Sequence, residues 1–199
     1  MTNAAGRRRP GYLLIGAALL VVLVVGGIAL WGSLGGAPSI GGPFTLTDGD
    51  GRQVTDRDFR GRWTLIYFGY TFCPDVCPTT LNQVAEALDA LGPKAARLQP
   101  VFITVDPARD TPAVVKQYTA AFTPKLVGLT GSPDEIAQVA KEYRVYYATH
   151  KTGSNPGDYT VDHSSILYLL DPDGRFVAPI RADSSGSEMA AALSRYLPS

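Results

Sequence analysis

Segments with strand-like and helix-like patterns alternate along most of this chain, and that alternation restricts its possible folds more than any other feature. The apolar run Trp63 to Phe68 is typical of a buried strand, and apolar residues between Leu81 and Leu91 recur at helical spacing. Further strands are predicted at Leu98 to Val105 and at Lys125 to Leu129. Strands joined through helices form a partly parallel sheet, so the pattern indicates an α/β fold.

Two predicted hairpins add antiparallel strands to this sheet. Phe44 to Thr47 and Gln53 to Thr55 flank a turn rich in Asp and Gly, which indicates a leading β-hairpin. Ser165 to Leu170 and Arg175 to Ile180 flank the turn at residues 171–174, which indicates a second hairpin. We therefore expect a mixed sheet flanked by helices, in the element order of a thioredoxin-like fold.

The remaining helices are predicted from their spacing and their end signals. One helix is expected over residues 111–122 and another, near the end of the chain, over residues 187–196. Between them, Ser132 at the N-cap, Pro133 at the first helical position and Glu135 at the third match a capping box. That arrangement predicts a further helix from residue 133.

An apolar run precedes the predicted domain. Tyr12 to Leu30 is a stretch of 19 residues without a charge. A helix of that length is about 28 Å long, enough to span a bilayer. Arg7, Arg8 and Arg9 before it predict that this end stays in the cytoplasm. We expect a retained single-pass transmembrane helix rather than a cleaved signal peptide, whose apolar core would be shorter.

These patterns divide the chain into four predicted segments. Residues 1–11 are a short basic cytoplasmic tail, 12–31 the transmembrane anchor, 32–42 a flexible tether rich in Gly, and 43–199 the thioredoxin-like domain. The short tether keeps the domain close to the membrane, on its extracytoplasmic face. Because no targeting segment of the mitochondrial type precedes the anchor, the preferred location is a bacterial cell membrane.

The charge balance excludes one class of partner. Lys plus Arg and Asp plus Glu each number 18, and no basic stripe follows the arginines of the leader. A nucleic-acid-binding protein normally carries a basic patch or a domain of high pI. We therefore expect no nucleic-acid partner.

The chain has two cysteines, Cys73 and Cys77, in the loop between the first buried strand and the following helix. Near a helix N-terminus the partial positive charge stabilises thiolates, so both thiols should ionise readily. Four-residue spacing on a first helical turn also places both side chains on one side. Because a disulfide closing so short a loop would stabilise the fold little, the pair indicates a thiol or metal site.

The two histidines have different surroundings. His163 directly precedes a predicted strand, whereas His150 belongs to the polar segment Thr149 to Asp158, which is typical of an exposed loop. A lone histidine is usually a surface or core residue, so the pattern around His163 does not by itself make it a ligand. Two thiolates and one imidazole would suit copper, whereas a structural zinc site would take a fourth protein ligand.

Several motifs resemble those of the Sco/SenC family of copper chaperones. The two most specific are Cys73-Pro74-Asp75-Val76-Cys77-Pro78 and Asp162-His163-Ser164-Ser165. Further similarity lies at residues 102–107, 109–112, 143–147 and 170–174, so it extends over nearly the whole predicted domain.

This resemblance implies a membrane-anchored metallochaperone rather than an enzyme, although thiol–disulfide exchange stays open. Cys73, Cys77 and His163 would bind Cu(I) or Cu(II), with Asp162 orienting the imidazole and Asp75 tuning the charge of the loop. The implied function is assembly of the binuclear copper centre of cytochrome c oxidase. The implied partners are the copper-bearing subunit of that oxidase and, as a further candidate, another periplasmic copper carrier.

Three other functions compete with this interpretation. A thiol–disulfide reductase would keep the cysteines of the oxidase copper site reduced, but its usual motif has two residues between the cysteines rather than three. A peroxiredoxin would resemble its family in a threonine three residues before the reactive cysteine, where this chain has Tyr70. A purely structural adaptor would leave the His163 motif unexplained.

Overall fold

The computed structural model describes residues 16, 20–24, 26–27 and 40–198. The predicted tail at 1–11 lies outside these residues, as does most of the predicted anchor at 12–31 and of the tether at 32–42. The described residues of the anchor are helical. Within the described part of the chain, no helix is both long and apolar enough to cross a membrane. Residues from 40 onward form one compact unit, which is described below by itself.

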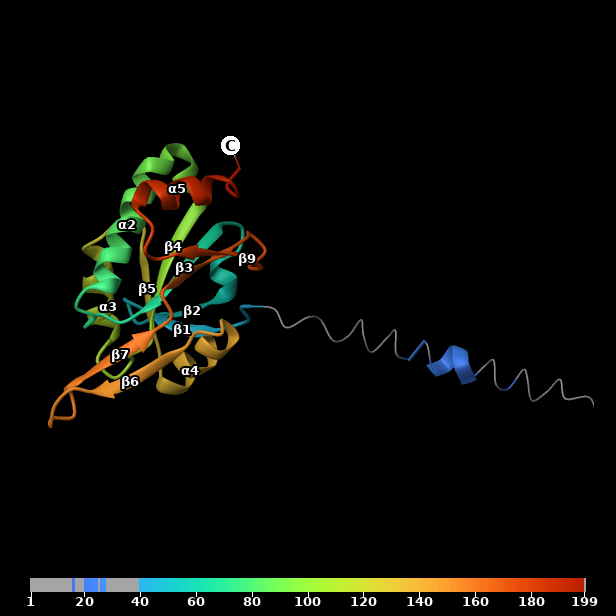
Figure 1. Ribbon diagram of the computed structural model, residues 1–199, viewed down its shortest axis with the longest axis horizontal. Helices are drawn as coiled ribbons and strands as arrows, with labels where there is room; N and C mark the ends of the chain where they lie inside the picture. Colours follow the sequence, from blue (N-terminus) through green and yellow to red (C-terminus); the bar gives the residue numbers. More distant parts are fainter. Residues whose placement is uncertain (1–15, 17–19, 25, 28–39, 199) are drawn as a thin grey trace, which may run out of the picture. The chain divides into compact units, whose positions relative to one another are not determined.

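A seven-stranded mixed sheet forms the centre of this unit (Figure 1). Its central strands β3, β4 and β5 are parallel, and antiparallel strands flank them on both sides. The predicted mixed sheet and its leading hairpin are therefore confirmed. In spatial order the strands are β2 (Gln53–Thr55), β1 (Thr45–Asp48), β5 (Val127–Thr130), β4 (Leu98–Thr104), β3 (Trp63–Gly69), β8 (Ile166–Leu170) and β9 (Phe176–Arg181).

Within residues 40–198, four α-helices accompany the sheet and lie within a few residues of the predicted ranges, and two short 3-10 helices were not predicted. The helix α2 follows the cysteine loop and packs against α5. The predicted capping box is present at the start of α4, where Ser132 and Glu135 exchange hydrogen bonds. The helices are α2 (Val76–Leu91), α3 (Pro112–Ala120), α4 (Pro133–Glu142), α5 (Gly186–Ser194), η1 (Asp56–Phe59) and η2 (Gly92–Arg97).

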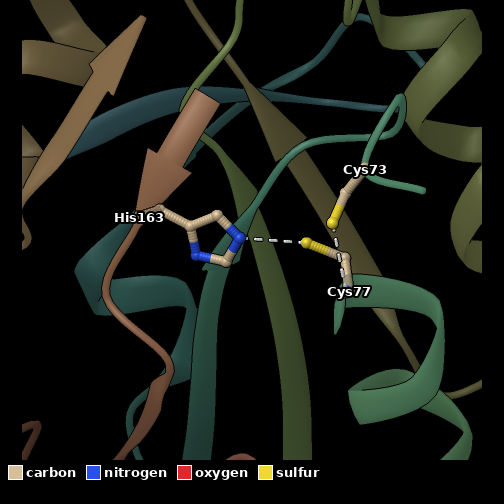
Figure 2. A group of neighbouring side chains, drawn as sticks. All are labelled: Cys73, Cys77 and His163. Carbon is tan, nitrogen blue, oxygen red and sulfur yellow. Dashed lines mark hydrogen bonds between the residues drawn. The ribbon is translucent and has the colours of Figure 1, made fainter. Parts of the chain in front are cut away.

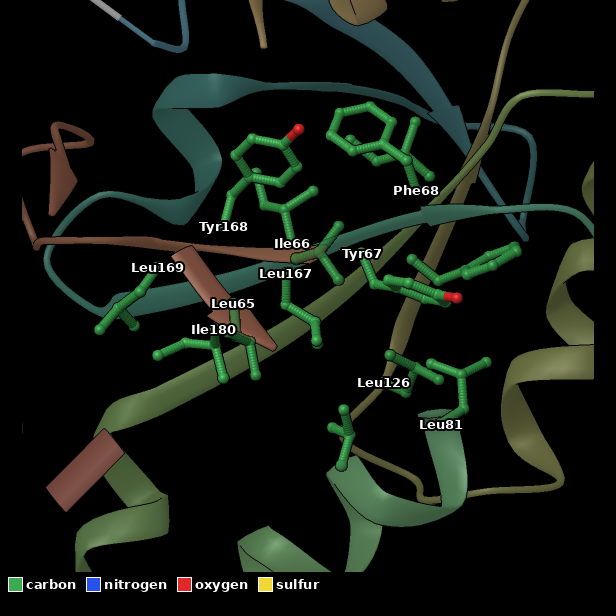
Figure 3. Close-up of a cluster of buried hydrophobic side chains, with 14 of the residues drawn as sticks. Leu65, Ile66, Tyr67, Phe68, Leu81, Leu126, Leu167, Tyr168, Leu169 and Ile180 are labelled. Carbon is green, nitrogen blue, oxygen red and sulfur yellow. The ribbon is translucent and has the colours of Figure 1, made fainter. Parts of the chain in front are cut away.

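Strand β3 is buried on both faces and lies in the interior of the sheet, between β4 and β8. Its side chains alternate, as the pleat of a strand requires. Figure 3 shows Tyr67 on the face that Leu81 of α2 covers, and Phe68 on the opposite face beside Tyr168. The strand therefore anchors the core on both sides while its last residue, Gly69, leads into the cysteine loop.

One element differs from the sequence-based expectation. Strands β6 (Tyr147–Lys151) and β7 (Tyr159–His163) form a separate two-stranded antiparallel hairpin, visible in orange in Figure 1. The prediction of an exposed loop over Thr149 to Asp158 was therefore wrong for its first residues. Most side chains of the hairpin are at least partly exposed, so the segment lacks the apolar alternation that marks a half-buried strand.

Candidate metal centre

The cysteine loop begins where β3 ends, and glycine is required at that point. A Cβ atom on Gly69 would lie 2.7 Å from Sγ of Cys77 and 3.0 Å from the ring of Phe102. Such a distance to the sulfur is shorter than Cβ atoms tolerate, so a side chain at this position would displace Cys77. The absence of a side chain at Gly69 therefore leaves room for the sulfur atom of Cys77 at the buried end of β3.

Asp110 is fully buried and holds the cysteine loop through Thr71. Its carboxylate accepts hydrogen bonds from the backbone N–H of Thr71 at 2.9 Å and from the Thr71 hydroxyl at 2.6 Å. The hydroxyl of Thr104 at the end of β4 donates to the same carboxylate. Burial raises the pKa of Asp110, and these bonds partly offset that rise. The loop that carries Cys73 is therefore tied to the end of β4.

Cys73, Cys77 and His163 come together at this loop (Figure 2). Their ligand atoms all lie within 4.8 Å of one another. The Cys77 sulfur lies 3.2 Å from Nε2 of His163, and the Cys77 backbone N–H donates to the Cys73 sulfur at 3.3 Å. Both cysteines are free thiols. The arrangement brings two sulfur donors and one imidazole nitrogen to a single point.

The two thiols are not equivalent, contrary to the expectation that both ionise readily. A hydrogen bond from the Cys77 thiol, with others from His163 and the Cys77 backbone, lowers the pKa of Cys73 to about 4. The pKa of Cys77 is raised, first because it donates that hydrogen bond to Cys73 and then because it is buried. The first proton therefore leaves Cys73, and its negative charge disfavours a second ionisation beside it.

Aromatic rings hold the imidazole of His163 in place. The rings of Tyr67 and Tyr70 meet it edge-on, with centroids 5.9 Å and 6.0 Å away. The Tyr67 hydroxyl also contacts the Cys77 sulfur at 3.7 Å. No sequence pattern marks Tyr67 as a site residue, because a tyrosine within an apolar run looks like an ordinary core residue.

The two acidic residues expected near the site both line the pocket beside it, but their side chains pair with groups other than the candidate ligands. Asp162 pairs with Nε2 of His150 at 2.9 Å, on the exposed side of the hairpin. Neighbouring residues on a strand point to opposite faces, so Asp162 is directed away when His163 faces the cysteines. The carbonyl oxygen of Ser164 lies 3.2 Å from Nδ1 of His163 instead. Asp75 is exposed and accepts a hydrogen bond from Thr79.

A pocket of about 410 Å³ opens above the candidate site. Tyr70, Cys73 and Val76 line one side of it, and Val161 and His163 of β7 line the other. Cys73 is partly exposed here, whereas Cys77 is buried. A ligand of a partner protein could therefore reach Cys73 and His163 directly, but Cys77 only through them.

A sequence profile of the SCO1/SenC family matches residues 33–198 of this chain. The chain is 44% identical to Protein sco1 of Schizosaccharomyces pombe, over 81% of this chain and 62% of that protein. It is 43% identical to the mitochondrial SCO1 homolog of Homo sapiens, over 81% of this chain and 54% of that protein. The chain thus spans about half to three fifths of these relatives' length.

Two solved structures are similar over most of the chain. Bradyrhizobium japonicum ScoI with copper bound is 52% identical, with a TM-score of 0.73 over 80% of this chain and 100% of that one. Yeast Sco1 with copper bound is 41% identical, with a TM-score of 0.74 over 80% of this chain and 88% of that one. From the extent of the profile match and these identities, the chain belongs to the SCO1/SenC family.

Proposed function

We propose that this chain binds copper through Cys73, Cys77 and His163 and assists assembly of the copper centre of cytochrome c oxidase. The observation that carries the proposal is the convergence of two sulfurs and one imidazole nitrogen within 4.8 Å. Thiolates favour Cu(I) and imidazole suits copper, whereas a structural zinc site takes four protein ligands. The copper-bound relatives from Bradyrhizobium japonicum and yeast support this assignment.

The role in oxidase assembly rests on family membership. BsSco, a solved protein 22% identical to this chain, is described as a member of the Sco family of cytochrome c oxidase assembly proteins. That likeness by itself establishes a shared fold, and the SCO1/SenC profile match supports a shared role. The recipient of the metal would be the copper-bearing subunit of the oxidase, and another periplasmic copper carrier would supply it.

The apolar run supports a location for this exchange. An anchor at 12–31 and a tether at 32–42 would hold the domain at 43–199 on the extracytoplasmic face of a bacterial membrane. The partly exposed Cys73 is the sulfur that a partner's ligand reaches first, and the buried Cys77 releases the metal last. Ligand-by-ligand exchange of this kind keeps the cargo coordinated throughout the transfer.

The unequal thiols favour thiol–disulfide exchange as a second candidate function. Cys73 is accessible and has a lowered pKa, which is the character of an attacking thiolate. Cys77 is protonated, buried and adjacent, as a resolving thiol would be. A reductase would use these residues to return the cysteines of the oxidase copper site to the thiol state. Oxidation to a disulfide would remove both sulfur ligands for copper.

Anaerobic copper titration of the reduced full-length chain in detergent tests the first candidate. We expect one copper per chain, with two sulfurs and one nitrogen in its coordination sphere by X-ray absorption. Substituting Cys73→Ser, Cys77→Ser or His163→Ala should each abolish tight binding and leave the circular dichroism spectrum unchanged. His150→Ala is the matched control, because it removes the other histidine, which pairs with Asp162.

Tight copper binding by the His163→Ala variant would contradict the proposed ligand set. If the reduced chain binds no copper but readily reduces a model disulfide, the reductase becomes the better assignment. Loss of binding in the His150→Ala variant as well would contradict the assignment of His163 as the histidine ligand, because either histidine substitution would then have the same effect.

A further inference from the structure

The turn that follows β4 contacts both segments that carry the candidate copper ligands. Asp110 accepts two hydrogen bonds from Thr71 in the cysteine loop. Arg109, its neighbour, contacts the hairpin formed by β6 and β7, which ends at His163. Asp110 and Arg109 therefore contact the cysteine loop and the His163 hairpin, respectively.

Arg109 makes the more extensive of these contacts. Its Nε donates to the carboxylate of Asp106 at 2.5 Å, and its Nη1 donates to the carbonyl oxygens of Tyr159 at 3.1 Å and Gly157 at 3.4 Å. The guanidinium lies 3.7 Å from the centre of the Tyr159 ring and 4.8 Å from that of Phe72. A stacked, hydrogen-bonded guanidinium fixes the position of its partners in a way that a single charge does not.

Asp106 accepts hydrogen bonds from both Arg109 and Tyr159. Its carboxylate accepts from the Tyr159 hydroxyl at 2.7 Å while it pairs with Arg109. The side chain of Asp106 is 5% exposed and that of Arg109 is 16% exposed. Because the pair is largely screened from water, it holds its geometry better than an ion pair on the surface would.

Apart from these contacts, the hairpin meets the main unit through buried Val161 and through His163, whose imidazole packs against Tyr67 and Tyr70. It forms its own two-stranded sheet, and Val161 is the buried residue of β7. Three residues of β6 are exposed. The aromatic contacts hold the His163 ring, and the course of the β7 backbone that brings this ring to the cysteines depends in part on the start of the strand, where Tyr159 is held.

We propose that Arg109, with Asp106 and Tyr159, is a positioning group that holds β7 so that the His163 imidazole faces Cys77. The inference rests on the proposed copper site. Asp110 holds the cysteine loop through separate bonds, so loss of the Arg109 contacts releases His163 while the two sulfur atoms stay together. Two thiolates alone still suit Cu(I), but Cu(II) depends more on the imidazole.

The test is the Arg109→Gln substitution in the full-length chain, measured first without metal. Hydrogen exchange at the amides of residues 147–163 should accelerate by roughly tenfold or more, because charge-assisted bonds to the hairpin are lost. With metal, Cu(II) affinity should fall by about 10- to 100-fold, the range typical for loss of a group that orients a ligand. Affinity for Cu(I) should fall less. In the electron paramagnetic resonance spectrum of bound Cu(II), the hyperfine coupling from the His163 nitrogen should weaken.

Two further variants sharpen the test. Tyr159→Phe keeps the stacked ring and removes the hydrogen bond to Asp106, so its effect should be smaller and in the same direction. It also serves if Arg109→Gln does not fold. Arg181→Gln is the matched control, because Arg181 pairs with Asp183 on the exposed surface. It should change neither exchange in the hairpin nor copper affinity.

The outcomes separate this inference from the proposed function. If the unsubstituted chain binds no copper, the proposed function fails, and accelerated exchange in Arg109→Gln still supports the contact with the hairpin. Unchanged exchange together with an unchanged Cu(II) spectrum in Arg109→Gln would overturn the inference. Equal loss of Cu(I) and Cu(II) affinity would also overturn it, because that result indicates a general effect on the fold.

Discussion

Cys73 and Cys77 lie four residues apart, yet their surroundings give the two thiols opposite acid–base properties. Cys73 is partly exposed and accepts a hydrogen bond from the Cys77 backbone N–H. Cys77 is buried beside the hydroxyl of Tyr67 and the imidazole of His163. In the metal-free protein one sulfur is therefore a thiolate and its neighbour is a thiol.

Alkylation of the reduced, metal-free chain should reveal this difference. The pKa of Cys73 is lowered to about 4, so its thiolate is almost fully formed by about pH 6, and its iodoacetamide reaction should be independent of pH from there to about pH 9. The reaction of Cys77 should stay slow over the same range. Peptide mass spectrometry measures both rates.

The Cys77→Ser variant gives a control for the cause of this shift. A serine hydroxyl donates in place of the thiol, so the reaction of Cys73 should stay independent of pH over most of that range. In Cys77→Ala the partner is lost and the pKa of Cys73 should rise. A rate in the unsubstituted chain that climbs steadily to pH 9 would contradict the assignment.

Helix α4 shows how far local signals determine an element. Ser132 accepts from the N–H of Glu135 at 3.3 Å, and the Glu135 carboxylate accepts from the N–H of Ser132 at 2.7 Å. These bonds satisfy amide groups that the start of a helix leaves without partners. Both bonds lie within four consecutive residues, which is why the sequence predicted this helix start.

Replacing Ser132 with alanine should destabilise the domain by about 1 kcal/mol, the usual effect of losing an N-cap side chain. Urea unfolding of the two proteins, with equal slopes, measures the difference as a lower midpoint. Ser154→Ala is a suitable control, because Ser154 is exposed in the turn between β6 and β7. Equal midpoints for Ser132→Ala and the unsubstituted chain would show that the cap contributes nothing to stability.

The hairpin of β6 and β7 shows the opposite case. Its residues carry no strong strand pattern, and the contacts that hold it include those of Arg109, which is 50 residues from Tyr159 along the chain. Tertiary contacts therefore give this segment its conformation and its place. Because it bears His163, the geometry of the candidate site depends on an element that local sequence patterns did not indicate.

At the scale of the whole molecule, the candidate site joins a loop of the main sheet to a hairpin of a separate sheet. A metal ion bound by Cys73, Cys77 and His163 would link these two parts. A ligand that binds only the folded state stabilises it according to its free concentration. Copper should therefore stabilise the whole domain against heat as well as order the hairpin.

Thermal unfolding of the reduced chain should shift upward when copper is added. At a free copper concentration of about 100 times Kd, the stabilisation is about 2.7 kcal/mol. In a domain of this size it corresponds to a rise in Tm of roughly 5 to 10 °C. The double variant Cys73→Ser/Cys77→Ser should show no rise, and an equal rise there would indicate binding at another place. Removing the metal with a chelator should restore the lower Tm.

Features that depend on neighbours along the chain could be predicted from local sequence patterns. Apolar spacing marked β3 and α2, turn residues marked the leading hairpin, and the capping box marked the start of α4. The motifs around Cys73 and His163 led to the family that the comparisons established. These patterns can be recognised because buried positions recur with the period of a strand or a helix, and a few consecutive residues are enough to show that period.

The way in which the parts of the candidate site meet depends on the three-dimensional packing of the chain. Cys77 and His163 are 86 residues apart, and no local periodicity encodes their contact at 3.2 Å. The unequal pKa values of the two thiols, the pairing of Asp162 with His150 and the contacts of Arg109 with the hairpin were also decided there. Each of these features depends on which groups the fold brings into contact and on how far it buries them from water. Both are set by three-dimensional packing.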